Sequence, residues 1–374
     1  LNAGAHGYNT AVGYYSGGAM STGIQNTIVG GLAGDALTTG SDNVAIGYAA
    51  LSAEDTGNRS IAIGRSALSQ QNNDASNYNV AIGYNAGVSV TSGITNTLIG
   101  GLAGDALTTC DGNTAVGYLA LSTEDTGGRS VAVGQGALKL QTGGGTTSVY
   151  NTAVGFEAGK ATTTGLYNTL IGGQAGLNLT TGSQNVVLGR QALYTEDTGE
   201  RNIAIGDRAL YDANFDGNGY NVGIGHDAGN DISTGVQNTI IGGNAAKANI
   251  TTGSNNIVIG YNAQAAAADS SNTTVIGTTT TTSALVHGLK QPVTSANASV
   301  AANVATPNTI YVFGDADGAT VTLPDSGSGT ELGKTYEFVT TVTATSNVHK
   351  IVCTDTTNER IMGSVTMVDT DSSD

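Results

Sequence analysis

The sequence predicts an all-β fold, a repetitive β-solenoid of the β-roll or β-prism type, and two observations carry that prediction. A five-residue segment like Asn43–Gly47 begins sixteen times between residues 9 and 277, most often at 17-residue intervals. Its fifth position is Gly in every copy, and its fourth is Ile, Val or Leu. A fixed period of this length is the signature of stacked repeats, in which each unit contacts only its neighbours.

The composition favours thin, regular stacking over a thick globular core. Gly accounts for 56 of the 374 residues, aromatic residues for 5%, and Trp is absent. The net charge of −16 disfavours nucleic-acid binding, because that requires clustered Lys and Arg. The sequence contains no run of about 18 apolar residues, so it predicts no membrane-spanning segment. Cys110 and Cys353 suggest no disulfide framework, and Cys110, which replaces a turn Gly, is predicted to be a free thiol.

Residues 1–8 form a polar lead-in, without the charged-then-apolar leader of a signal peptide. A start without Met indicates processing or a fragment of a longer chain. Residues 9–277 form the repeat shaft, and each copy opens with a strand of alternating side-chain direction. Val80 and Ile82 are expected on one side of that strand, and Asn79 and Ala81 on the other.

Each strand ends at a Gly, where a Cβ would obstruct the corner of the coil. The predicted corner glycines are Gly13, Gly30, Gly47, Gly64, Gly83, Gly100, Gly117, Gly134, Gly155, Gly172, Gly189, Gly206, Gly225, Gly242, Gly260 and Gly277. If each coil adds roughly 4.8 Å, sixteen coils make a rod of about 75 Å. The recurring Asn at the first strand position predicts an amide ladder between coils.

A longer period of about 70 residues overlies the coils. The residue after a nearly constant Ala runs Gly17, Gly34, Leu51, Leu68, and the same order then recurs. Four coils therefore make one super-repeat. Because the expected inward residues (Ala, Val and Ile) cover a coil thinly, we expect three chains to bury the apolar faces and close the sheet edges. A homotrimer is therefore favoured over a monomeric solenoid.

Beyond the shaft the composition changes. Residues 278–293 read as a Thr-rich neck, and residues 294–374 as a C-terminal antiparallel β domain. The expected strands are 309–313, 319–323, 335–340, 350–353 and 361–367. The polar ending at 369–374 lacks a closing strand, which is typical of an incomplete domain.

The repeats carry a family resemblance. Units such as Asn113–Leu121 resemble those of bacteriophage tail-fibre proteins and related bacterial surface proteins. They are also similar, though not in length, to the head repeats of trimeric autotransporter adhesins, where Val-Ala-Ile-Gly recurs in a left-handed β-roll. The C-terminal segments Val321–Tyr336 and Gly363–Val365 resemble small β domains that end phage fibres. No counterpart of the self-cleaving chaperone of many fibres is found, so autoproteolysis is not implied.

Three Glu-Asp pairs could be taken for the paired carboxylates of a glycoside hydrolase. They begin at Glu54, Glu124 and Glu196, and each is followed by an Arg: Arg59, Arg129 or Arg201. Duplication explains three equivalent copies better than one active site does. We therefore interpret the pairs as turn structure, with an ion pair expected between Asp55 and Arg59.

Other candidate sites are weaker. His6, His226, His287 and His349 are scattered, and their spacing indicates neither a zinc site nor a catalytic triad. Residues 155–160 superficially resemble a phosphate loop, but the spacing is wrong.

Asp212, Asn214 and Asp216 match the opening half of a calcium-binding loop, in a lengthened coil. Position 12 of that loop would be Gly223 instead of Glu. The alternative is an Asx-rich polar turn.

Ice binding would need an unbroken Thr column, and Val44, Ile61 and Val80 interrupt the one that includes Thr10 and Thr27.

These observations favour a non-enzymatic structural fibre of a phage virion, attached to tail or capsid, with a tip for host-surface attachment. The alternative is a bacterial extracellular trimeric adhesin or filament subunit, and an enzyme such as a capsule depolymerase ranks third. The expected partners are two further copies of the chain, a host receptor such as a glycan, and other virion proteins. The expected location is the virion or the extracellular surface. Recognition is expected beyond Pro292, because the coils repeat and loops on a scaffold usually carry binding.

Overall fold

The computed structural model describes residues 7–145, 148–248 and 250–278, together with the backbone of five short strands further on. The chain divides into two compact units, Leu1–Ala284 and Leu285–Asp374, and each is described by itself. In the described part of the first unit there is no α-helix, and the single helical turn is the 3-10 segment η1 (Gly143–Gly145).

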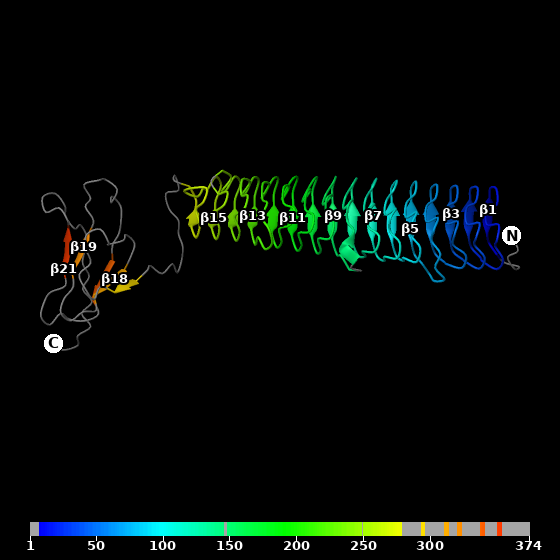
Figure 1. Ribbon diagram of the computed structural model, residues 1–374, viewed down its shortest axis with the longest axis horizontal. Coiled ribbons are helices and arrows are strands. Elements are labelled where there is room, and N and C mark those ends of the chain that lie inside the picture. Colours follow the sequence, from blue (N-terminus) through cyan, green and yellow to red (C-terminus); the bar gives the residue numbers. More distant parts are fainter. Residues whose placement is uncertain are drawn as a thin grey trace, which may run out of the picture. The chain divides into compact units, whose positions relative to one another are not determined.

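The first unit is an all-β solenoid of sixteen parallel strands, which confirms the predicted fold class. Consecutive strands lie side by side along one face (Figure 1). Their bounds are β1 (Thr10–Val12), β2 (Thr27–Val29), β3 (Val44–Ile46), β4 (Ile61–Ile63), β5 (Val80–Ile82), β6 (Thr97–Ile99), β7 (Thr114–Val116), β8 (Val131–Val133), β9 (Thr152–Val154), β10 (Thr169–Ile171), β11 (Val186–Leu188), β12 (Ile203–Ile205), β13 (Val222–Ile224), β14 (Thr239–Ile241), β15 (Ile257–Ile259) and β16 (Thr274–Ile276). Equivalent repeat positions pair, as Val44 does with Ile61.

The corner glycines adopt a conformation that side chains disfavour, as the sequence predicts. Their φ angles lie between +130° and +144°, except at Gly277, where φ is +86°. A Cβ built on Gly117 would lie 2.5 Å from the carbonyl oxygen of Gly134 in the next coil. Both the backbone angle and the close approach of the coils therefore require Gly.

Turns make up the rest of each coil, and they contain left-handed residues that are not Gly. Around strand β3 these are Asp42, Ala49 and Leu51, with φ of 61°, 53° and 53°. Each donates its N–H to a neighbouring coil: Asp42 to Ile24, Ala49 to Gly31 and Leu51 to Ala67. Hydrogen bonds between coils thus hold a conformation that local sequence preference would not select.

The interior is closed within a single chain, which corrects one expectation. The inward residues are mainly Ala and Leu and are fully buried, such as Ala45 and Leu51. The Val and Ile side chains at the first and third strand positions point outward instead. The expected alternation of strand faces is right, but the core does not need other chains to cover it.

The four-coil super-repeat reflects how the side chains of successive coils fill this core. In the sixth coil, Leu98 and Leu107 occupy the interior, and a Cβ on Gly104 would lie 2.6 Å from Leu107 Cδ1. In the seventh coil the strand residue is the smaller Ala115, and Leu121 fills the space beside it. Large side chains at one position thus accompany small ones at the other, as close packing requires.

The predicted amide ladder is confirmed. The Asn43 N–H donates to Asn26 Oδ1 (3.0 Å), and Asn43 Nδ2 donates to the Gly57 carbonyl (2.9 Å). The next coil has Ser60 in place of Asn, and Gln71 bridges the gap by donating to Ser60 Oγ (2.9 Å). The ladder satisfies the polar groups of a narrow interior.

Five strands are described in the second unit: β17 (Val293–Ser295), β18 (Ile310–Phe313), β19 (Thr320–Leu323), β20 (Glu337–Thr340) and β21 (Lys350–Cys353). Strand β18 pairs with β17 and β20, and β19 pairs with β21, all in parallel. These pairings correct the expected antiparallel arrangement, because alternation predicts strand faces and not strand direction. The expected strand at 361–367 lies outside the described residues.

Candidate functional site

The glutamates of the Glu-Asp pairs are buried, and at Glu54 and Glu196 the side chain accepts a hydrogen bond from a backbone N–H of its own turn. Glu54 Oε1 accepts the N–H of Gly57 (2.7 Å), and its Oε2 accepts from Gln71 Nε2 (3.0 Å) and Asn77 Nδ2 (3.1 Å). Glu196 likewise accepts the N–H of Gly199 (2.7 Å). Burial raises the pKa of both carboxyl groups, although these hydrogen bonds oppose the shift. Enclosed by donors, the two carboxylates have no side open to a substrate.

The arginines that follow these pairs make other contacts than expected. Arg59 lies 3.8 Å from Asp42, in the preceding coil, so the predicted ion pair with Asp55 is wrong. Its guanidinium group lies over the ring of Tyr78, 5.6 Å from the centroid. The same cation–π pair recurs in the two later super-repeats: Arg129 with Tyr150, and Arg201 with Tyr220.

The proposed calcium ligands lie on one lengthened loop. Asp212, Asn214 and Asp216 are exposed, whereas the intervening Ala213 and Phe215 point into the core. Asp216 Oδ1 accepts a hydrogen bond from the Thr198 hydroxyl (3.1 Å). Across the described residues, no group of three or more His, Cys, Asp and Glu side chains is placed to hold a metal. Calcium binding here stays a prediction.

A charged cluster joins three coils near β13. Asp227 is fully buried and accepts two hydrogen bonds from Arg208 (2.9 Å each) and one from Lys247 (2.5 Å). His226 Nδ1 lies 3.4 Å from the same carboxylate. Burial acts to raise the pKa of Asp227, but the hydrogen bonds from Lys247 and Arg208 outweigh it and the pKa is lowered. The other three histidines lie outside the described residues.

The outer face of the sixteen-stranded sheet is uncharged along its whole length. The first and third residue of each strand point outward, and every one of them is Thr, Val, Ile or Leu. Several are well exposed, including Leu188 (45%) and Ile276 (47%). The Thr column that includes Thr10 and Thr27 lies on this face and alternates with Val and Ile. An apolar surface of this extent is typical of an interface.

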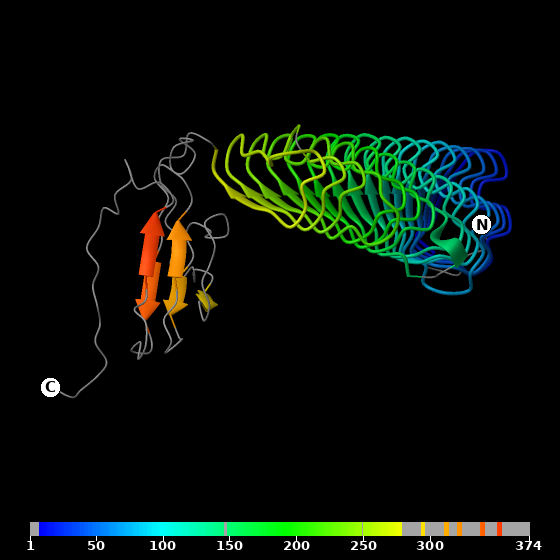
Figure 2. The same cartoon turned by 60° about the vertical axis from the view of Figure 1, so that its left-hand side comes forward.

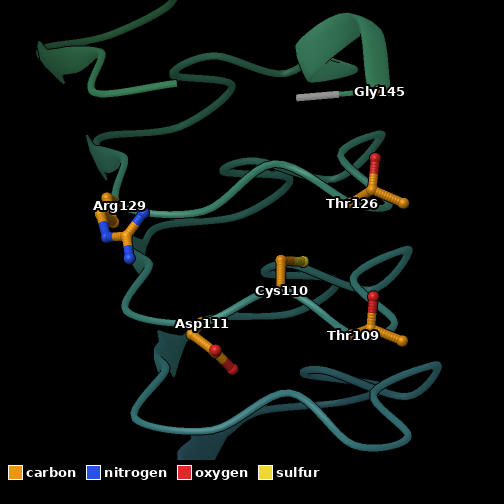
Figure 3. Close-up of a pocket in the computed structure, with 6 residues that line it drawn as sticks. All are labelled: Thr109, Cys110, Asp111, Thr126, Arg129 and Gly145. Carbon is orange, nitrogen blue, oxygen red and sulfur yellow. The ribbon is translucent and has the colours of Figure 1, made fainter. Parts of the chain in front are cut away.

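A pocket of about 440 Å³ opens between the turns of the sixth, seventh and eighth coils. Arg129 and Asp111 lie on one side and Thr109, Thr126 and Gly145 on the other, with Cys110 between them (Figure 3). Cys110 is a buried free thiol, as predicted, and donates to the Asp125 carbonyl (3.3 Å). Burial raises the pKa of Cys110 to about 12, so the thiol is protonated at neutral pH.

Sequence reasoning missed both the pocket and the outer apolar face. The longest interval between copies, 21 residues after Ser130, was the available signal for the pocket. The face was hidden because alternation alone does not say which side of the strand is the interior.

No protein-family model, curated protein or solved structure matches this chain. Within the residues that the structure describes, no helix has the length and apolar character needed to cross a membrane.

Proposed function

We propose that this chain is a non-enzymatic structural fibre of a phage virion, assembled as a homotrimer and used for attachment to the host surface. The observation that carries the proposal is the outer face of β1 to β16, which is continuous and uncharged. A long face with a regular period is best covered by a surface of the same length and period. Further copies of the same chain provide such a surface.

The area of the face is adequate for stable association. Sixteen strands at roughly 4.8 Å, each three residues of about 3.3 Å long, make a surface of roughly 750 Å². A standard protein interface buries about 800 Å² per partner. The charge of −16 resides elsewhere, so self-association through this face does not bring like charges together.

The shaft supports a spacer role. Its interior is filled mainly with Ala and Leu side chains, and hydrogen bonds join each coil to the next, so about 17 residues suffice to extend the rod by one coil. The segment after the coils is not repeated, and in the proposal it forms the tip that meets the host receptor.

The test separates shaft from tip. Residues 292–374 are deleted, a foreign trimerisation domain is fused after Thr282, and binding to host cells is compared with that of the whole chain. Loss of binding with an intact shaft is expected. Undiminished binding would place recognition in the coils and overturn the assignment to the tip.

Electron microscopy of the native particle, with antibodies against this chain, distinguishes the virion from the alternative of a bacterial adhesin or filament. Label on phage tails or capsids is expected. Label confined to bacterial surfaces would replace the viral proposal with the bacterial one.

A further inference from the structure

Two columns of residues border the outer face of β1 to β16. The leading column contains the residue before each five-residue segment, such as Thr95, and the trailing column contains the residue after each corner Gly, such as Gly101. Because equivalent positions pair from strand to strand, each column runs along one edge of the stacked strands, with one residue per coil (Figure 2). Six residues of extended chain separate the columns by about 20 Å, so the two edges of one copy do not touch.

Both columns carry exposed aromatic side chains. Tyr78 and Tyr220 in the leading column are 53% and 49% exposed, and Tyr84 and Tyr118 in the trailing column are 52% and 53% exposed. Tyrosine is enriched at protein interfaces, because its ring is apolar and its hydroxyl can form a hydrogen bond there. The aromatic residues therefore extend the apolar face across both of its edges.

In the proposed homotrimer the three outer faces turn toward one axis. The leading edge of each copy then lies beside the trailing edge of the next, and cyclic symmetry places equivalent residues of the three copies at the same height. Which coils meet at these edges depends on how far the strands incline to the axis. Level strands bring identical coils together, and an inclination of roughly 4.8 Å over 20 Å shifts the contact by one coil.

The charged residues of the columns distinguish between these registers. If identical coils met, Arg59 would face Arg65 of the next copy. If each leading residue met the trailing residue of the preceding coil, Arg201 would face Arg190. Both arrangements bring two arginines together, and like charges repel each other.

A shift in the other direction removes this conflict. When each leading residue meets the trailing residue of the following coil, Tyr78 faces Gly101 and Tyr220 faces Gly243. A large ring then lies against a residue that has no side chain, as close packing requires. The first and third super-repeats have the same match, between Tyr8 and Gly31 and between Tyr150 and Gly173.

Charged residues also gain partners in this register. Asp42 faces Arg65, which pairs opposite charges, and Tyr167 faces Arg190, which permits a cation–π contact. In the other three super-repeats, the position of Tyr167 holds Gln or Thr and the position of Arg190 holds Tyr. The arginine and the tyrosine that it would cover therefore occur together at these two positions.

We propose that the copies of the trimer interlock along their edges with an offset of one coil. Each leading residue packs against the trailing residue of the following coil in the next copy. The outer face repeats in every coil and would accept several registers, whereas the two columns select one of them. The inference rests on the proposed homotrimer and describes how its copies fit together.

The test uses pairs of cysteines in the full chain, with Cys353→Ser throughout. Gly243→Cys is combined with Tyr220→Cys for the proposed register, with Gln237→Cys for identical coils, or with Asn255→Cys for the opposite shift. The three leading residues are exposed and have similar φ angles of 49°, 60° and 59°, so the three pairs are matched in backbone conformation.

The variants are oxidised with copper phenanthroline and separated by electrophoresis without reductant. The pair Tyr220→Cys/Gly243→Cys should form covalent trimers at least about five-fold faster than the other two pairs, because a disulfide requires Cα atoms within about 7 Å. Cys353→Ser alone should form none. A second set around Gly101→Cys, with Tyr78→Cys for the proposed register and Thr95→Cys for identical coils, gives the answer if the first set does not fold.

Sedimentation of each variant before oxidation separates this inference from the proposed function. A mass of three chains, combined with equal rates, no cross-link or a faster reaction of another pair, would overturn the offset register and retain the trimer. A mass of 37.2 kDa before oxidation, or covalent dimers in place of trimers, would overturn the trimer as well.

Discussion

At Gly117 the backbone angle and the neighbouring coil both exclude a side chain. The φ of +136° is costly for other residues, and a Cβ would contact the Gly134 carbonyl oxygen at 2.5 Å. Gly117→Val should lower the free energy of unfolding by at least about 1–3 kcal/mol, measured by urea denaturation. Gly173→Ala is the control, because a Cβ there has no neighbour within 4 Å, and its stability should not fall. Equal stability of both variants would contradict the corner assignment.

Glu54 and Glu196 predict an unusual pH dependence. Their pKa values are raised in the folded state, chiefly by burial, so folding favours the protonated forms. The stability that they contribute is complete below the unfolded value of 4.5 and is lost as pH rises through the folded pKa. Between pH 7 and 5 the wild-type Tm should therefore rise with acidification more steeply than that of a Glu54→Gln/Glu196→Gln variant. Equal slopes of Tm against pH for the wild type and the variant would show that these two glutamates do not cause the pH dependence.

Between elements, Asp227 couples the coils that carry β12, β13 and β14. Its pKa is lowered because the hydrogen bonds from Lys247 and Arg208 outweigh the effect of burial, so its contribution to stability is present above 3.8 and is lost below that pH. Asp227→Asn should lower the denaturation midpoint at pH 7 more than Asp207→Asn, whose side chain is partly exposed. A larger loss for Asp207→Asn would show that burial does not strengthen the Asp227 contacts.

The coil was largely predictable from the sequence because one constraint, Gly at each corner, repeats at a fixed interval. The left-handed conformation of Leu51 and Ala49 was not predictable, because hydrogen bonds from adjacent coils override the local conformational preference of these residues. The Arg59 contact was wrongly predicted because residues one coil apart are closer in space than residues four apart in the turn. The pocket beside Arg129 is lined by the turns of three consecutive coils, and spacing alone does not specify how those turns lie against one another.

For the whole molecule, the outer sheet face should control assembly and not folding. Ile82 points outward from β5, so Ile82→Asp should leave the solenoid folded while placing a charge in the proposed interface. Circular dichroism and sedimentation would then report a folded chain of lower mass. Gln70→Asp, on an exposed turn, is the matched control and should keep the wild-type mass. Unfolding of the Ile82 variant would mean that this face stabilises the single chain.

Sedimentation equilibrium of the unmodified chain shows directly whether the apolar outer face associates copies of this protein. We expect a mass near three times that of the 37.2 kDa chain, unchanged on dilution to low concentration. A folded species of 37.2 kDa that retains its β-sheet signal would contradict it.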